Sequence, residues 1–464
     1  MHAIVVAGTH SGVGKTSVTL GLIASLRRRG LTVQPFKVGP DFIDPAHHSR
    51  AAGRPAHNLD GWMLSREANL ELFATHTADA DIAVIEGMMG LFDGPDPRSN
   101  AGSAAEMATW LGAPVVLVID ANAIARSAAA LVHGYATFDA DVRVAGVLAN
   151  RVGSAGHAEL IAEALDDLRP LLGWLAHDPE LAMPERHLGL VLPDRDADAR
   201  IERLADAVEP NLDFDLLLDR SRTSRARPPS AAPSAPVSPH VRIGVARDEA
   251  FSFYYEDNLS QLAAAGAELI EFSPLRDELP WGLDGLYIGG GYPELHAADL
   301  AANTPVLEGI RAMAAACRPI YGECGGLIYL GEAIEIGDQR HSLCGVVPLR
   351  TRFPARLEIG YAEVEIDRGP LGTGELARGH RFHKADISRI DAAIRSCYDV
   401  RLVRSADGLR EGYAFGSALV SWIHLHFRSC PSLASNLVAA CSAATARPRP
   451  GARSAEPAQR PGTQ

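Results

Sequence analysis

The sequence predicts an α/β protein of two domains, the first built on a mostly parallel sheet. Short apolar runs alternate with helical patterns along most of the 464 residues. A glycine-rich loop at 8–17 and a cysteine-containing turn at 322–326 each separate an apolar run from a helical pattern. Residues 221–240 are rich in Arg, Ser, Ala and Pro, which is typical of a linker. We therefore expect domains at 1–220 and 241–441 and a disordered tail at 442–464.

The composition excludes several classes of protein. The net charge of −13 argues against a nucleic-acid partner, because the phosphate backbone requires a basic surface. The apolar runs are shorter than the roughly 18–20 residues that span a bilayer. The chain enters its first strand directly, without the features of a signal peptide. We therefore predict a cytoplasmic protein without a membrane partner.

Cysteine and lysine usage is informative. The six cysteines all follow residue 316 and form no C-x-x-C pair, so neither a disulfide framework nor a zinc site is indicated. Lysine occurs three times, at Lys15, Lys37 and Lys384, whereas arginine is abundant. A flexible point charge differs from a planar guanidinium, so the positions that keep lysine merit attention. Two of them lie in the motifs described next.

The first strand, Ala3–Ala7, leads into a phosphate-binding loop and then a helical pattern that extends to Arg29. In such a loop the backbone N–H groups surround phosphate, the lysine neutralises it, and the hydroxyl after the lysine binds Mg²⁺. The match to G-x-x-x-x-G-K-[ST] is offset, since Gly8 lies one place too early. A glycine-rich turn without chemistry is the alternative. The expected nucleotide-binding residues in this loop are Gly12, Gly14, Lys15, Thr16 and Ser17.

Acidic residues follow the next two predicted strands, Thr32–Phe36 and Asp81–Gly87. Asp41 and Asp44 come after the first of these, Glu86 lies at the end of the second, and Asp93 is in the loop beyond it. In parallel sheets ligands bind at the carboxyl ends of the strands, and carboxylates there hold Mg²⁺ or a substrate group. Asp41 and Asp44 could alternatively be turn formers beside proline.

Two further strands, Val115–Ile119 and Val144–Ala149, complete the pattern of the first domain. Asn150 follows the second of them and is a candidate for recognising the nucleotide base, although asparagine is also common in turns. His47, His48 and His57 show no metal-ligand spacing, so we expect them to be exposed or core residues.

The second domain begins with the strand Val241–Ala246 and continues with Glu268–Phe272 and Gly285–Ile288. Pro319–Tyr321 then leads into the turn at 322–326, which places Cys324 on a strand-to-helix elbow. Such a turn exposes the thiol, and a helix N-terminus favours the thiolate. A buried apolar cysteine is the alternative.

Two other segments complete a candidate site around Cys324. Gly290 and Gly291 belong to a glycine run whose bare N–H groups could stabilise an oxyanion. His424 is a candidate base. A thiol, an imidazole and an N–H loop are sufficient for acyl transfer through a thioester. The segment 378–384 is basic and histidine-rich, and a substrate-facing loop, a metal pair and a solvated strand edge are all open interpretations.

Combined, the two domains indicate that ATP activates a carboxylate and that ammonia, released from glutamine, converts it to an amide. The sequence also resembles a known family, the glutamine-dependent cobyrinic acid a,c-diamide synthases of cobalamin biosynthesis. The resemblance covers residues 1 to 441 except the linker. Its most specific segments are 8–16, 36–45, 86–94, 184–190, 321–326 and 424–427.

The resemblance implies a role for each candidate residue. Cys324 would be the glutaminase nucleophile and His424 the residue that activates it. Lys15 and Thr16 would serve ATP and Mg²⁺, while Asp41, Asp44, Glu86 and Asp93 would handle metal, phosphate or substrate carboxylates. The first domain would resemble the P-loop fold of dethiobiotin synthetase and the second a class I glutamine amidotransferase. Those amidotransferases carry His-x-Glu at the base, but residue 426 is His, so the group that orients His424 stays unassigned.

The expected partners are cobyrinic acid, L-glutamine and ATP, with hydrogenobyrinic acid or a nickel tetrapyrrole as alternative substrates for the same chemistry. The oligomeric state is open, a homodimer being one candidate. A more distant alternative is a partitioning-type P-loop ATPase that switches a partner. That alternative leaves the Cys324 domain unexplained, and His10 stands where those ATPases carry an additional lysine.

Overall fold

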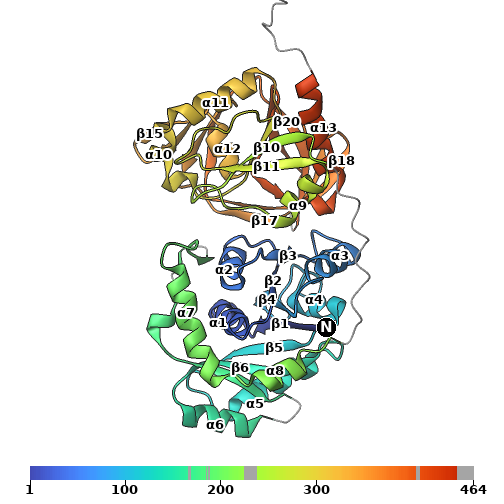
Figure 1. Ribbon diagram of the computed structural model, residues 1–464, viewed down its shortest axis with the longest axis vertical. Coiled ribbons are helices and arrows are strands. Elements are labelled where there is room, and N and C mark those ends of the chain that lie inside the picture. The colour runs from blue at the N-terminus through green and yellow to red at the C-terminus, as the bar shows by residue number, and fades with distance from the viewer. Residues whose placement is uncertain (166–168, 184, 187–188, 224–237, 404–407, 447–464) are drawn as a thin grey trace, which may run out of the picture.

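The computed structural model describes residues 1–165, 169–183, 185–186, 189–223, 238–403 and 408–446. Two α/β domains lie one above the other, the N-terminal domain in blue to green and the C-terminal domain in yellow to red (Figure 1). The predicted fold class is therefore confirmed. Most of the predicted linker lies outside the described residues, but its first residues pack on the first strand, where Ala3 N donates to Ser221 O at 2.9 Å.

The N-terminal domain is built on a seven-stranded sheet in the order β3-β2-β4-β1-β5-β6-β7, and all neighbouring strands are parallel. Its strands are β1 (His2–Gly8), β2 (Val33–Val38), β3 (His57–Leu59), β4 (Ile82–Gly90), β5 (Val115–Asp120), β6 (Val144–Val152) and β7 (Leu171–Ala176). Because β1 is central, its carboxyl end lies between those of β4 and β5, which is where the phosphate loop begins.

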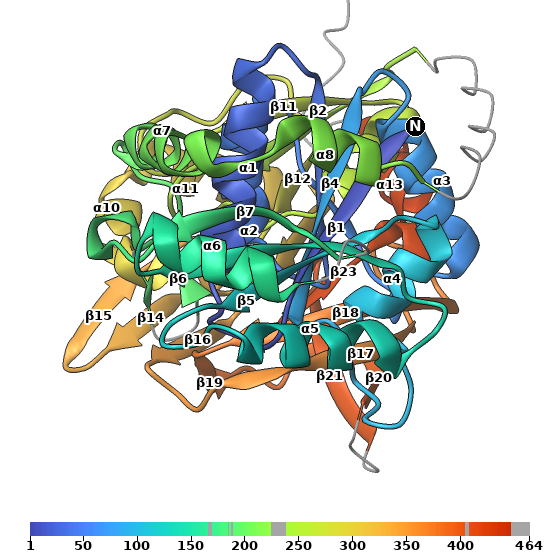
Figure 2. The same ribbon diagram turned by 90° about the horizontal axis from the view of Figure 1, so that it is seen from below.

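Helices cover both faces of this sheet. Ala3, Val5 and Ala7 of β1 join one apolar cluster, and Ile4 and Val6 join the other, as the two-residue period of a strand requires. One layer holds α1 (Lys15–Arg28), α2 (Ile43–Ala52), α7 (Ala197–Val208) and α8 (Phe214–Arg220). The other holds α3 (Arg66–His76), α4 (Ala104–Leu111), α5 (Ser127–Phe138) and α6 (Ala155–Ala164). Figure 2 shows α1, α7 and α8 on one side of the strands and α5 on the other.

Helix α7 and several short elements connect β7 to α8. The short elements are η1 (Pro179–Leu181), the hairpin strands β8 (Glu185–Arg186) and β9 (Gly189–Leu190), and η2 (Glu209–Asn211). The hairpin contains the described part of the predicted 184–190 motif.

The C-terminal domain contains a ten-stranded sheet in the order β11-β10-β12-β13-β22-β21-β20-β17-β18-β23. The strands from β11 to β22 in this order are parallel, and the remainder pair antiparallel. The strands are β10 (Val241–Ala246), β11 (Ala267–Phe272), β12 (Gly285–Ile288), β13 (Ile320–Glu323), β17 (Glu358–Ile366), β18 (Glu375–His383), β20 (Arg395–Leu402), β21 (Gly408–Phe415), β22 (Ala418–Ser421) and β23 (Ile423–Leu425).

The sheet of the C-terminal domain curls back on itself. Only Trp422 separates β22 from β23 along the chain, yet four strands separate them in the sheet. The curl brings β23, with His424, back toward β13 and the Cys324 turn that follows it.

Helices and a smaller sheet complete this domain. The helices are α9 (Glu256–Ala264), α10 (Ala297–Ala302), α11 (Thr304–Ala315), α12 (Gly325–Leu330) and α13 (Ser432–Ala446), with 3₁₀ turns η3 (Pro293–Leu295) and η4 (Phe427–Ser429). The smaller sheet has the order β15-β14-β16-β19, from β14 (Ala333–Ile336), β15 (Gln339–Ser342), β16 (Leu349–Phe353) and β19 (Asp386–Ile390).

The two domains contact each other through α2 and β3 on one side and α9 and β17 on the other (Figure 1). Tyr361 OH donates to the buried Asp60 Oδ2 at 2.8 Å across this interface. Phe253, Tyr255 and Tyr361 of the C-terminal domain belong to the same apolar cluster as the core of the N-terminal domain. The second domain therefore covers the carboxyl ends of β2 and β3, where Phe42 and Asp60 lie.

Some sequence expectations need correction. Residues 88–90 continue β4 and residues 150–152 continue β6, although both were expected to be loops. The segment 378–383 lies in β18 between β17 and β23, so it is not a strand edge. The tail was expected from 442, but α13 continues to Ala446; the remaining residues lie outside the described chain. Within the described chain, no helix is long and apolar enough to cross a membrane.

Candidate active sites

The phosphate loop joins β1 to α1. Gly12 and Gly14 have φ angles of 81° and 91°, in the left-handed region that favours glycine. Asn150, at the end of β6, donates from Nδ2 to Val13 O at 2.9 Å. A Cβ on Gly14 would lie 2.1 Å from the same nitrogen. Glycine is therefore required at position 14 for this close approach. Asn150, which was expected to recognise the nucleotide base, uses its side-chain amide to hold the phosphate loop.

Lys15 and the neighbouring residues open α1 at this loop. Lys15 Nζ donates to His10 O at 3.3 Å. Burial lowers the pKa of Lys15, and the positive charge of Lys37 lowers it further. A buried ammonium group beside a second cation is stabilised by an anion, so the surroundings of Lys15 suit a phosphate group. Thr16 and Ser17 follow in the first turn, both half-buried.

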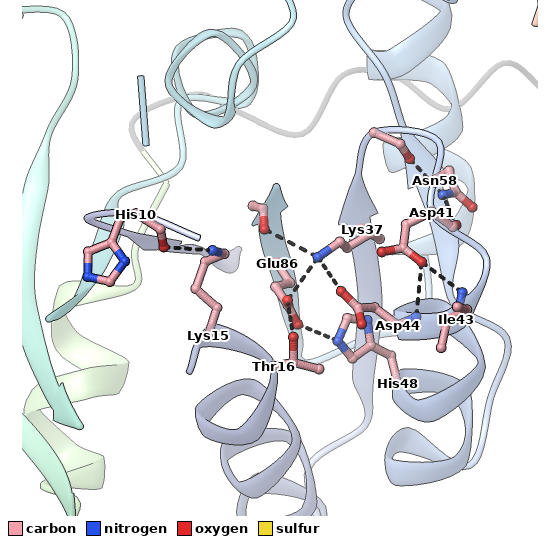
Figure 3. Close-up of polar contacts among 12 residues, drawn as sticks. His10, Lys15, Thr16, Lys37, Asp41, Ile43, Asp44, His48, Asn58 and Glu86 are labelled. Carbon is pink, nitrogen blue, oxygen red and sulfur yellow. Dashed lines mark hydrogen bonds and ion pairs between the residues drawn. The ribbon is translucent and has the colours of Figure 1, made fainter. Parts of the chain in front are cut away.

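Glu86, in the middle of β4, is the centre of a buried polar cluster (Figure 3). Thr16 Oγ1 donates to Glu86 Oε1 at 2.8 Å, and Lys37 Nζ donates to the same oxygen at 2.8 Å. His48 Nε2 lies 2.6 Å from Glu86 Oε2. Burial alone would raise the pKa of Glu86, but the charges of Lys37 and His48 outweigh burial and hold the pKa well below its usual range. Glu86 is therefore a carboxylate that fixes the Thr16 hydroxyl.

Asp41 and Asp44 lie on the other side of Lys37, at the start of α2 (Figure 3). Asp44 Oδ2 is 2.6 Å from Lys37 Nζ, whereas Asp41 Oδ1 accepts from the backbone N of Ile43 at 2.7 Å. Burial and the nearby charge of Asp44 raise the pKa of Asp41 to about 7. Asp44 and Glu86 therefore share the Lys37 ammonium group, while Asp41 is held by the backbone N–H groups of Ile43 and Asp44.

The donor set at this edge suits Mg²⁺, which prefers a hydroxyl, one or two carboxylates, phosphate oxygens and water. In the described chain, no group of three or more His, Cys, Asp and Glu side chains is arranged to hold a metal by itself. Such an arrangement is not required when phosphate supplies ligands. Asp93 lies further along, where its Oδ2 accepts from Gly90 N at 2.8 Å, and its charge raises the pKa of Lys15 against the lowering effect of burial.

Lys37 is one of the lysines that the sequence singles out, but the sequence gives it no role, and His48 was expected to be an exposed or core residue. Lys37 and Glu86 are direct partners on neighbouring strands β2 and β4, which requires the strand order and cannot be read from the chain. His48 could have been found, because it follows Asp44 by four residues and therefore shares its face of α2.

Cys324 stands on the predicted elbow between β13 and α12, with φ 50° and ψ −98°. This strained backbone is typical of a nucleophile turn. The thiol is buried and donates to Phe382 O at 3.4 Å. Burial, reinforced by the charge of Glu294, raises the pKa of Cys324. The expected stabilised thiolate is therefore not the resting state, and the thiol needs a base to remove its proton.

His424 is buried in β23, and neither of its ring nitrogens has a hydrogen-bond partner within the described chain. Burial lowers its pKa to about 3, so the imidazole is neutral at pH 7 and one of its nitrogens carries a lone pair. In the sheet, His424 pairs with His380 of β18, two residues before the Phe382 carbonyl that holds the thiol. Gly290 lies against the ring, since a Cβ there would be 2.3 Å from His424 Cε1.

The glycine run at 289–291 packs beside the elbow. Gly290 N donates to Phe253 O at 3.3 Å, so this N–H is engaged and is a poorer oxyanion donor than expected. Gly291 N lies 3.1 Å from the place that a Cβ on Gly325 would occupy, next to Cys324. Gly291 is therefore the better oxyanion candidate of the two.

The two candidate sites adjoin across the domain interface. Phe42, between Asp41 and Ile43, has its ring centroid 4.8 Å from that of His424. The same ring stacks on Phe253, whose carbonyl holds the glycine run, at 5.3 Å and 11°. The loop that carries the acids of the first site therefore contacts the base of the second.

A nucleotide-phosphate domain joined to a thiol acyl-transfer domain defines a glutamine-dependent amide ligase. Residues 4–191 match the CobQ/CobB/MinD/ParA nucleotide binding domain family, and residues 242–431 match the CobB/CobQ-like glutamine amidotransferase domain family.

Curated relatives align along nearly the whole chain. A cobyrinate a,c-diamide synthase of Syntrophotalea carbinolica is 50% identical over 450 residues, covering 94% of this chain and 98% of the relative. Those of Leptospira interrogans and Salmonella typhimurium are each 40% identical, covering 94% and 95% of this chain and 98% of each relative. The chain belongs to the cobyrinate a,c-diamide synthase family. It is an ATP-dependent ligase of cobalamin biosynthesis that takes its nitrogen from glutamine, which disfavours the partitioning ATPase.

Proposed function

We propose that this protein amidates the a and c carboxylates of cobyrinic acid, using one ATP and one glutamine for each amide. The observation that supports the proposal is the contact between Phe42 and His424, because the loop proposed to activate the carboxylate lies against the site proposed to release ammonia. The relatives that align over 94% of the chain are named for this reaction.

In the glutaminase half, Cys324 Sγ attacks the side-chain amide carbon of glutamine while His424 takes the thiol proton. The tetrahedral oxyanion is stabilised by backbone N–H groups, of which Gly291 is the best placed. His424 then returns the proton to the leaving nitrogen, which departs as ammonia and leaves a thioester on Cys324. Water hydrolyses the thioester to glutamate and restores the thiol.

In the ligase half, Gly12, Gly14 and Lys15 hold the nucleotide phosphates at the end of β1. The terminal phosphoryl group passes to a substrate carboxylate, giving an acyl phosphate and ADP. Ammonia attacks the acyl carbon and phosphate leaves, so that an amide forms. Mg²⁺ would be held by Thr16 with Glu86, Asp44 or Asp41 nearby, and when bound it neutralises charge on the transferring phosphoryl group.

The identity of the ring decides between this proposal and its alternatives. Mass spectrometry of cobyrinic acid and hydrogenobyrinic acid, each incubated with enzyme, ATP, Mg²⁺ and glutamine, tests it. Each amidation replaces a hydroxyl group by an amino group, so we expect cobyrinic acid to lose mass in two equal steps. Reaction of hydrogenobyrinic acid alone would move the enzyme to the cobalt-free substrate. No reaction of either ring would leave a nickel tetrapyrrole as the next substrate to test.

The other expectations stay predictions. These are the domain boundaries at 220 and 241, a cytoplasmic location, the lack of nucleic-acid and membrane partners, and a homodimer as one candidate assembly. The two family matches end at 191 and begin again at 242, which agrees with a boundary between these positions.

A further inference from the structure

We propose that Glu323 is the positioning residue that orients His424, by accepting a hydrogen bond from Nδ1–H so that Nε2 is free to take the thiol proton. This inference rests on the proposed roles of Cys324 and His424. Glu323 would then be the group that orients His424, which stayed unassigned because the sequence lacks the His-x-Glu pattern.

The two side chains face each other inside the C-terminal domain. Glu323 Oε2 lies 3.8 Å from His424 Nδ1, and each side chain is 1% exposed. Neither nitrogen of the imidazole has a hydrogen-bond partner within the described chain. A buried polar group of this kind is costly unless it is paired, so Nδ1 requires an acceptor, and this carboxylate faces it.

The hydrogen bonds of Glu323 leave one acceptor position open on the side of His424. Tyr321 OH and Leu425 N donate to Oε1 at 2.7 Å and 3.0 Å. Tyr287 OH donates to Oε2 at 2.8 Å. A carboxylate has about four lone-pair sites, two on each oxygen, so the free one is on Oε2. That oxygen is also the one nearest Nδ1.

The fold explains why the acid comes from this position. Glu323 is the last residue of β13, directly before the Cys324 elbow, and the curled sheet returns β23 to it. The bond from Leu425 N ties the residue after His424 to the same carboxylate. Residue 426, where other amidotransferases carry Glu, is His, and its ring stacks on Tyr255 at 4.7 Å. The carboxylate therefore reaches the imidazole from the nucleophile strand.

The separation of 3.8 Å is longer than a hydrogen bond, which needs about 2.7–3.2 Å. Catalytic hydrogen bonds are often long before substrate binds and shorten in the complex. We propose that the imidazole turns toward Glu323 when substrate binds; Gly290, beside the ring, has no Cβ to oppose such a rotation.

Burial raises the pKa of Glu323 to about 7, and its three hydrogen-bond donors oppose the rise. The titratable groups around it are Tyr287, Tyr321, His424, Tyr254, Tyr255, Tyr398 and Cys324. Above pH 7 the carboxylate accepts from Nδ1–H; below pH 7 the carboxylic acid does so poorly. Glutamine-dependent activity should therefore fall as the pH is lowered through about 7.

The test uses the full-length protein with Glu323→Gln, which keeps the size of the side chain and removes its charge. We expect kcat with glutamine to fall by about 10²–10⁴-fold, the usual contribution of acid–base catalysis. Amidation with free ammonia should stay at the wild-type rate, and the change of activity near pH 7 should disappear. Glu323→Asp, which keeps the charge, should recover part of the activity. Wild-type kcat and pH profile in Glu323→Gln would overturn the proposal.

Glu411 offers a matched control, because it is also a buried carboxylate and accepts from Ser421 Oγ at 2.7 Å and from Trp422 N at 2.7 Å. In Glu411→Gln, glutamine-dependent activity should still fall as the pH is lowered through about 7. A Glu411→Gln variant without this pH dependence, together with a Glu323→Gln variant that retains it, would contradict the assignment.

Two further variants separate this proposal from folding and from the proposed function. If Glu323→Gln loses ammonia-dependent activity as well, Tyr321→Phe is the deciding variant, because it removes one hydrogen-bond donor to the carboxylate. The change of glutamine-dependent activity should then occur at a higher pH than in the wild type. An unshifted profile would overturn the inference. Cys324→Ala tests the proposed function itself. If glutamine use survives in Cys324→Ala, the glutaminase assignment fails whatever Glu323 does.

Discussion

Lys37 provides the most direct test of the buried charge cluster in the ligase domain. Its side chain is 3% exposed, and Nζ contacts Asp44 Oδ2 at 2.6 Å, Glu86 Oε1 at 2.8 Å and Gly87 O at 3.3 Å. Lys37→Met keeps the apolar stem but removes the charge. Asp44 then loses its cation, while Glu86 retains Thr16 and His48.

The size of the effect follows from burial. Removing one partner of a buried ion pair costs about 3–5 kcal/mol, because the remaining charge stays desolvated. For a domain of this size each kcal/mol lowers the melting temperature by about 2–4 °C. We therefore expect Lys37→Met to lower the melting temperature of the N-terminal domain by about 6–20 °C. Lys37→Arg should not restore it, since a planar guanidinium cannot occupy the site of a compact ammonium group.

Differential scanning calorimetry of the full chain measures this shift, and the transition that ATP raises in the wild type identifies the ligase domain. Lys384→Met is the matched control, because Lys384 is half-buried at a strand end. We expect this variant to change the free energy of unfolding by no more than about 0.5 kcal/mol. A melting temperature for Lys37→Met equal to that of the control would refute the description of this cluster.

The remaining predictions concern the two activities separately. Cys324→Ala should abolish glutamine use and retain amidation with free ammonia; loss of both in a folded protein would contradict separate tasks for the two domains. Lys15→Ala should abolish amidation from either nitrogen source, and full activity would exclude the phosphate-loop assignment. Phe42→Ala removes the ring that packs on His424 and should lower glutamine-dependent turnover by about 10²-fold, the usual effect of a misplaced catalytic group. Phe42→Leu, which keeps an apolar side chain there, should lose less, and an equal loss with ammonia would contradict a specific role at His424.

The local motifs of both sites could be predicted from the sequence because each is a contiguous strand, turn and helix. Gly14, Lys15 and Thr16 lie where the pattern placed them, and Cys324 stands on an elbow between β13 and α12. Such elements depend on backbone chemistry within a few residues, which the chain shows directly.

Contacts between distant strands could not be predicted in the same way. The pairing of Lys37 with Glu86 depends on β2 lying beside β4, and the approach of Glu323 to His424 depends on a sheet that curls. The contact between Phe42 and His424 depends on how the domains dock. The electrostatics of Cys324 also needed the structure, because burial opposes the helix N-terminus that the motif emphasised.

We propose that this single chain transfers glutamine nitrogen to two carboxylates of cobyrinic acid. Mass spectrometry of the corrinoid product, with wild type and Cys324→Ala incubated in parallel with ATP, Mg²⁺ and either glutamine or ammonium, tests it most directly. We predict the diamide in the wild type from both nitrogen sources, and in Cys324→Ala from ammonium alone. Unchanged cobyrinic acid in the wild type with both sources, while ATP and glutamine are hydrolysed, would contradict the assignment of this ring as the substrate.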